Sequence, residues 1–116
     1  MREVETWVRY FCKQAAAVAT RSKDPSTQVG CVIVDDDNSI ISTGYNGMPP
    51  HMKETKEIWE RPVKYDFVVH AETNAVALAA KSGRSLAGST AYITHMPCSS
   101  CMKLLISSGV QPRLNK

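Results

Sequence analysis

The chain has 116 residues, of which 43% are hydrophobic and 22% are charged, and its formal net charge is +3. This composition is typical of one globular domain with a single core, residues 1–116. The small charge, without a basic stripe, argues against duplex nucleic acid as a partner. No run approaches the roughly twenty apolar residues that span a bilayer, and the start lacks the apolar stretch of a signal peptide. We therefore expect a cytoplasmic protein with no membrane partner.

The first part of the sequence predicts a helix followed by a β-hairpin. From Glu3 to about Ser22 apolar residues recur at helical spacing, which indicates an amphipathic helix. The β-branched run Val29–Val34 predicts a strand. An acidic turn leads from it into a second predicted strand, Ser39–Tyr45, so that the two strands form a hairpin. Residues 46–67, rich in proline and charge, are too long for a plain connection, which predicts a functional or disordered loop.

The second part predicts two helices separated by a strand. Ala71–Ser82 is rich in strong helix formers. Thr90–Thr94 predicts a strand, and residues 98–108 repeat the helical pattern. The polar tail, Val110–Lys116, contains a proline, so we predict neither a helix nor a strand there. The order of the elements indicates an α/β fold in which helices cover a mixed sheet.

The most specific pattern combines His70-Ala71-Glu72 with a later pair of cysteines, Cys98 and Cys101. Two cysteines three residues apart at the start of a helix face the same way, which suits two thiolates on one tetrahedral zinc ion. His70 would be the third ligand and would leave the fourth position for water, as in catalytic zinc sites, with one Zn²⁺ per chain. Zinc lowers the pKa of bound water to about 7, and Glu72 is the candidate for shuttling the proton.

A structural interpretation of the same residues stays open. A Cys-x-x-Cys pair alone is often a structural zinc knuckle or a pair of core thiols, and a lone histidine is usually a packed or surface residue. A structural zinc site needs four protein ligands. The spare candidates for a fourth ligand are His95, Cys12 and Cys31.

The sequence resembles the zinc nucleotide deaminases, whose signature is H-x-E followed by P-C-x-x-C. The matching residues are His70, Glu72, Pro97, Cys98 and Cys101. Residues 21–30 and 42–49 are similar to the segments that mark the deoxycytidylate deaminases within that superfamily. The resemblance implies a three-layer α/β/α cytidine-deaminase-like fold around a five-stranded mixed sheet. It also implies hydrolysis of dCMP to dUMP and ammonia, which feeds thymidylate synthesis: zinc-bound hydroxide attacks C4 of cytosine, with Glu72 as proton shuttle.

Regulation and assembly are also implied by the resemblance. Members are commonly homo-oligomers, often hexamers, activated by dCTP with Mg²⁺ and inhibited by dTTP. Glycines let backbone N–H groups approach a nucleotide, and an asparagine offers both a donor and an acceptor. Asn-Gly is equally a common turn after a strand. The residues of the implied nucleotide loop are Gly44, Tyr45, Asn46 and Gly47.

Five further residues are candidates for nucleotide contacts, each with an ordinary alternative. Lys23, Ser26 and Arg21 would meet the substrate or the effector, or would be solvated surface residues. Tyr65 or Phe67 would stack on a base, or would pack in the core.

The C-terminal end departs from the family pattern. Relatives continue after the second cysteine helix with an apolar strand, and here the C-terminal strands are expected to be shortened or missing. We therefore expect the chain to depend on neighbouring subunits. Two other functions stay open: deamination of cytidine, guanine or a transfer RNA adenosine, and a regulatory module without turnover, against which the retained Glu72 argues.

Overall fold

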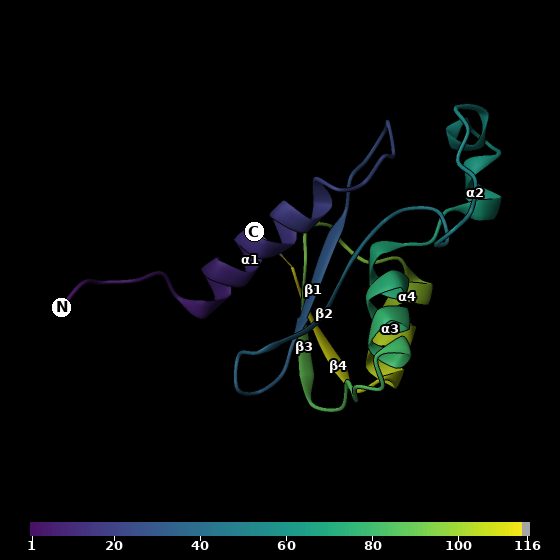
Figure 1. Cartoon of the computed structure of the whole chain (residues 1–116). Coiled ribbons are helices and arrows are strands. Elements are labelled where there is room, and N and C mark those ends of the chain that lie inside the picture. The colour runs from purple at the N-terminus through teal and green to yellow at the C-terminus, as the bar shows by residue number, and fades with distance from the viewer. Residues whose placement is uncertain (115–116) are drawn as a thin grey trace.

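The computed structural model describes residues 1–114, which form three layers: a central sheet with helix α1 on one face and helices α3 and α4 on the other (Figure 1). Within these residues, no helix has both the length and the apolar character needed to cross a membrane. The elements in chain order are α1 (Trp7–Ala19), β1 (Gly30–Val34), β2 (Ile40–Tyr45), the 3₁₀ helix η1 (Glu57–Trp59), α2 (Lys64–Phe67), α3 (Ala71–Lys81), β3 (Ser89–Ile93), α4 (Ser99–Ser107) and β4 (Val110–Leu114).

The sheet is mixed, as predicted, with the strand order β2-β1-β3-β4. Strand β1 pairs antiparallel with both β2 and β3, whereas β3 and β4 run parallel. The predicted hairpin between β1 and β2 is confirmed. Its acidic turn is held by Asp35, whose carboxylate accepts the backbone N–H groups of Asp37 and Ser39 at 2.9 Å each.

Helix α1 covers the sheet with Phe11 and Ala15, which are fully buried against the side chains of β1 and β3. It approaches so closely that a Cβ on Gly30 would lie 2.0 Å from the Ala15 carbonyl oxygen. The helix begins at Trp7 rather than at the predicted Glu3. Thr6 explains the start, since its hydroxyl accepts the N–H of Arg9 at 3.2 Å and so caps the helix.

Helix α3 lies close against β2 and β1 on the opposite face. Its buried stripe consists of alanines at helical spacing, Ala71, Ala75 and Ala79. Their small side chains let the helix approach the sheet closely. The Ser42 hydroxyl of β2 donates to the Ala75 carbonyl oxygen at 2.9 Å. Next to it, Gly44 leaves room for the α3 backbone, and this packing fixes the N-terminal end of α3 relative to the sheet.

The prediction that the tail forms no strand was wrong. Strand β4 pairs with β3 from Ser89 opposite Val110 to Ile93 opposite Leu114. Pro112 is tolerated because β4 lies at the edge of the sheet, where a missing N–H costs no interior hydrogen bond. Val110 is buried and the strand alternates from it in exposure. The strand expected to be missing after α4 is therefore present, and the sheet within residues 1–114 has four strands, where the resemblance implies five.

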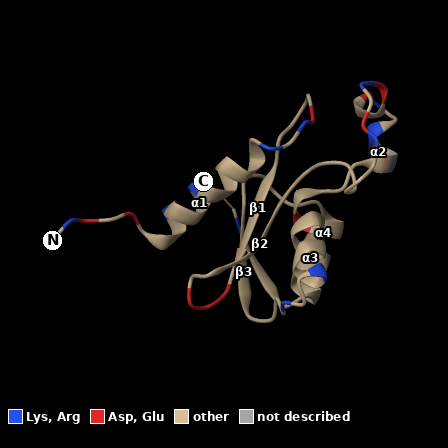
Figure 2. Ribbon diagram, viewed as in Figure 1, with Lys and Arg blue, Asp and Glu red and all other residues tan. Residues whose placement is uncertain are grey.

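The long segment between β2 and α3 has a defined shape. It contains η1 and the single turn α2, and it extends away from the layered body, carrying charges of both signs (Figure 2). Its base is closed by a bridge in which Gly47 and Val69 exchange backbone hydrogen bonds of 3.0 and 2.7 Å. His70 directly follows Val69 of this bridge.

Candidate metal centre and nucleotide pocket

The N-terminal ends of α3 and α4 bring the predicted ligands together. His70 is the N-cap residue of α3 and Cys98 is the N-cap residue of α4. Neither helix end has a side-chain cap, so unpaired N–H groups and the positive end of each helix dipole favour anionic groups there. Cys101, in the first turn of α4, completes the group.

The distances within the group fit a tetrahedral ion. The Nδ1 atom of His70 lies 3.2 Å from Sγ of Cys101 and 3.5 Å from Sγ of Cys98. The three ligand atoms all lie within 4.8 Å of one another. Zinc bonds of about 2.3 Å to sulfur and about 2.0 Å to nitrogen would separate the two atoms by about 3.5 Å at the tetrahedral angle. The residues therefore fit a zinc ion with one coordination position left open.

Cys101 needs a cation in order to ionise. Burial, reinforced by the negative charge of Glu72, raises the pKa of the Cys101 thiol to about 12 in the metal-free chain. The side chain is 3% exposed, so water cannot stabilise the thiolate. Binding of a metal ion would have to displace this proton, which couples metal affinity to pH.

Glu72 lies beside these ligands in the first turn of α3 and is 4% exposed. A cavity of about 230 Å³, which we call the ligand cavity, is lined by His70, Glu72 and Cys98. His95 lines the same cavity, but within residues 1–114 the grouped metal ligands do not include it, nor Cys12 or Cys31. A four-ligand structural site is therefore not supported. The geometry favours a three-ligand centre with a carboxyl group next to it.

Comparison with known proteins decides the family. A model of the cytidine and deoxycytidylate deaminase zinc-binding region matches residues 5–113. The chain belongs to this family. Mouse (Mus musculus) deoxycytidylate deaminase is 40% identical over 111 residues, which are 90% of this chain and 61% of the mouse protein. The chain thus spans about three fifths of the length of that relative.

Two further relatives are closer in length to this chain. The deoxycytidylate deaminase of Mycobacterium phage D29 is 33% identical over 118 residues, with 90% of each chain covered. A crystal structure of dCMP deaminase from the cyanophage S-TIM5 in complex with dCMP and dUMP superposes with a TM-score of 0.77 and 30% identity, over 97% of this chain and 85% of that one. The deaminase fold predicted from the sequence is therefore confirmed, with the correction at β4.

A second cavity of this chain, of about 360 Å³, lies beside the predicted nucleotide loop, and we call it the loop cavity. Five of the candidate residues line it, together with Trp59 and residues 47–52. Lys23 also forms an exposed ion pair with Glu54 at 3.1 Å. The candidate residues brought together here are Arg21, Lys23, Gly44, Tyr45 and Gly47.

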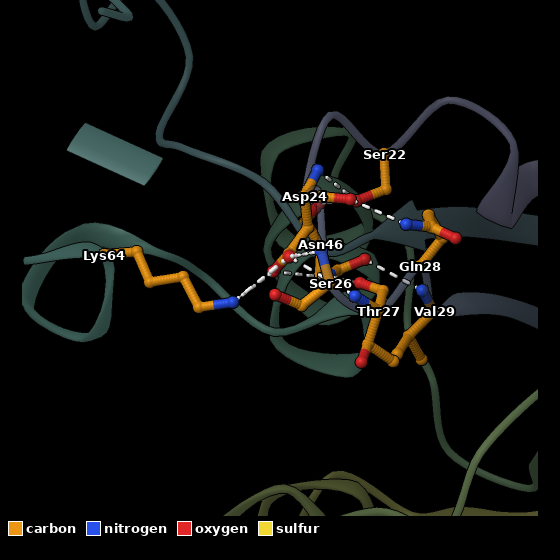
Figure 3. A network of polar contacts seen from close by, with 8 residues as sticks. All are labelled: Ser22, Asp24, Ser26, Thr27, Gln28, Val29, Asn46 and Lys64. Atoms are coloured by element: carbon orange, nitrogen blue, oxygen red, sulfur yellow. Dashed lines mark hydrogen bonds and ion pairs between the residues drawn. The ribbon is translucent and has the colours of Figure 1, made fainter. Parts of the chain in front are cut away.

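Two of the remaining candidates are Asn46 and Ser26: Asn46 lines the ligand cavity instead, and Ser26 lines neither cavity. Asn46 is 8% exposed and both ends of its amide are used within the protein: Oδ1 accepts the N–H of Val29 at 2.8 Å, and Nδ2 donates to the carbonyl of Thr27 at 2.9 Å (Figure 3). Ser26 is exposed, and its backbone N–H donates to Asp24 at 2.8 Å. Their proposed role in nucleotide binding stays a prediction.

The structure adds residues that sequence reasoning missed. Asp24 and Lys64 line the ligand cavity and form a buried ion pair. The available clue was a lysine placed among apolar and aromatic residues just before His70. Tyr65 and Phe67 are 60% and 40% exposed, so the core alternative was wrong for both, and Tyr65 lines the ligand cavity.

Proposed function

We propose that the chain catalyses the zinc-dependent hydrolytic deamination of dCMP to dUMP and ammonia. The observation that carries the proposal is a three-ligand metal group beside a buried carboxyl group, Glu72, which lines the same cavity as two of the ligands, His70 and Cys98. Likeness to a deaminase crystallised with dCMP and dUMP supports the choice of substrate.

His70, Cys98 and Cys101 would hold the ion, because their donors match zinc in chemical type and in spacing. The chemistry that zinc supplies when bound is the acidification of water at the open coordination position, to a pKa of about 7. Glu72 would accept one proton of the attacking water at its carboxylate and deliver it to the ring nitrogen. It would then transfer the remaining proton, from the hydroxyl group formed at the attacked carbon, to the departing amine, which leaves as ammonia. The burial of Glu72 excludes bulk water from this transfer.

The loop cavity is the proposed site of an effector nucleotide, dCTP with Mg²⁺ or dTTP. Support comes from the positive side chains of Arg21 and Lys23 beside the rings of Tyr45 and Trp59. The backbone N–H of Gly47 is already used in the bridge to Val69, so side chains rather than the glycine backbone would carry recognition.

A homo-oligomer, such as a hexamer, is also proposed. The support is an exposed apolar group on the first turn of α1, where Trp7, Val8 and Tyr10 are 57%, 40% and 38% exposed. Light scattering during size exclusion would measure the assembly, and a monomer at micromolar concentration would contradict it.

The substrate is tested by incubating zinc-loaded protein with dCMP, cytidine, guanine and a transfer RNA, and measuring ammonia. We expect release from dCMP and at least about a hundredfold lower kcat/KM for the others, because the phosphate and the sugar contribute binding energy. A higher kcat/KM for another base or nucleoside would show that dCMP is not the preferred substrate. Repeating the dCMP assay with dCTP and Mg²⁺, or with dTTP, tests the effector.

A further inference from the structure

A buried ion pair joins two parts of the chain that are 40 positions apart. The Nζ atom of Lys64 lies 3.1 Å from both carboxylate oxygens of Asp24 (Figure 3). The two side chains are 5% and 6% exposed, so neither charge is solvated by bulk water. Removing one partner from such a pair leaves an uncompensated charge, which makes the pair a strong tie.

The Asp24 side of the pair is held firmly by the body of the protein. Its Oδ1 accepts the backbone N–H of Ser26 at 2.8 Å and that of Thr27 at 3.3 Å, and its Oδ2 accepts from the amide of Asn46 at 3.4 Å. Burial alone would raise the pKa of Asp24, but the hydrogen bonds from Ser26 and Thr27 and the charge of Lys64 together hold it below its ordinary value. The carboxylate is thus a fixed anchoring point.

The Lys64 side belongs to a segment with few other ties. Among those residues of the segment 48–68 whose burial the structure describes, Lys64 alone is buried. The segment extends from the body and carries charges of both signs (Figure 2). Among the ion pairs of the described side chains, one other joins it to the body, between Lys23 and Glu54, and the lysine of that pair is exposed. An exposed pair contributes little, so the position of the segment depends on Lys64.

The tie lies at the wall of the ligand cavity. Asp24 and Lys64 both line it, as do Tyr65, within the α2 turn, and Val68, directly after it. Release of Lys64 would therefore displace one wall of the cavity that contains Glu72.

We propose that Lys64 is a positioning residue: its ion pair with Asp24 anchors the segment 48–68 and thereby sets Tyr65 and Val68 in the wall that receives the nucleotide. The role in the reaction rests on the proposed function, whereas the anchoring does not. The pair acts through the segment and does not take part in proton transfer.

The anchoring is tested by limited trypsin digestion of zinc-loaded protein, with cleavage mapped by mass spectrometry. Lys64→Met keeps the length of the side chain and removes its charge. We expect cleavage after Lys53 and Lys56 to become about tenfold faster or more, because the segment opens locally. Cleavage after Lys81, in α3, should stay at the wild-type rate, which separates local opening from global unfolding.

Two variants and one control sharpen the test. Asp24→Asn should produce the same pattern, and Lys64→Arg should restore most of the protection, because a guanidinium group pairs with a carboxylate in two contacts. The matched control is Lys13→Met, which removes an exposed ion pair between Lys13 of α1 and Glu5, just before the helix. It should change neither the cleavage after Lys53 and Lys56 nor the kinetics.

The kinetic arm measures dCMP deamination by the same samples. We expect Lys64→Met to raise KM about tenfold or more, with kcat changed less and zinc content unchanged, because the wall and not the centre is displaced. Wild-type cleavage in Lys64→Met would overturn the anchor, and faster cleavage with an unchanged KM would overturn its role at the site. A wild-type chain without dCMP turnover would refute the proposed function, and the digestion would still decide the anchor.

Discussion

Gly44 offers a sharp test of how the site is built, since the sequence suggests a nucleotide loop and the structure suggests packing. A Cβ added at Gly44 would lie 2.2 Å from the carbonyl oxygen of Ala71 and 2.5 Å from the backbone nitrogen of Ala75. Both atoms belong to the backbone of α3, so no side-chain rotation relieves the clash. Gly44→Ala would force α3 away from β2 by about 1 Å, in an interior packed as densely as an organic crystal.

The magnitude follows from the kind of atoms involved. Overpacking a core costs about 1–3 kcal/mol, and the upper end applies here because two backbone atoms obstruct the methyl group. A loss of about 3 kcal/mol is a large part of the 5–15 kcal/mol typical of a domain. With a urea m-value of about 1–3 kcal/mol/M, the unfolding midpoint should fall by about 1–3 M.

The assay is urea unfolding followed by circular dichroism, with Gly47→Ala as the matched control from the same loop. At Gly47 the nearest atom to an added Cβ is a ring carbon of Tyr45 at 3.6 Å, an ordinary contact, so stability should change little. Because α3 begins after His70 and carries Glu72, Gly44→Ala should also bind zinc more weakly. Equal midpoints for the two variants would refute the packing argument.

Three other predictions follow from the site. Cys98→Ala should retain less than about a tenth of the zinc by metal analysis, because two protein ligands hold the ion poorly, and full zinc loading would contradict the ligand assignment. Asn46→Ala should lower the free energy of unfolding by about 1–3 kcal/mol in urea with zinc content unchanged, since the N–H of Val29 loses its acceptor; an unchanged midpoint would count against this. Because the pKa of Asp24 is lowered in the folded protein, its carboxylate stabilises the fold fully above the unfolded-state pKa of about 3.9, and this stabilisation is lost as pH falls through the folded-state pKa. Asp24→Asn should therefore make the urea midpoint of unfolding depend less on pH on the acid side.

The grouping of the candidate metal ligands was predictable because much of its geometry is local. Cys98 and Cys101 face the same way by helical spacing alone, and a helix start after His70 could be inferred from the helix formers that follow it. The meeting of His70 with the two cysteines at adjacent helix ends depends on the sheet, but the resemblance to the family already implied that the three residues lie together.

The supporting contacts were not predictable from local patterns. The pairing of Asp24 with Lys64 spans 40 positions, and only the fold brings the two together. Gly44 has the same sequence context whether it serves a ligand or the packing of α3. Strand β4 was missed because Pro112 outweighed the alternation around it, although an edge position removes the objection to proline.

The central claim is that Glu72 moves protons beside a zinc ion held by His70, Cys98 and Cys101. The most direct measurement compares dCMP turnover by wild type and Glu72→Gln at matched, measured zinc content. We predict that the amide variant keeps its fold and its zinc and loses at least about a hundredfold in kcat, because an amide cannot accept and return the proton. Turnover by Glu72→Gln near the wild-type rate would contradict the account.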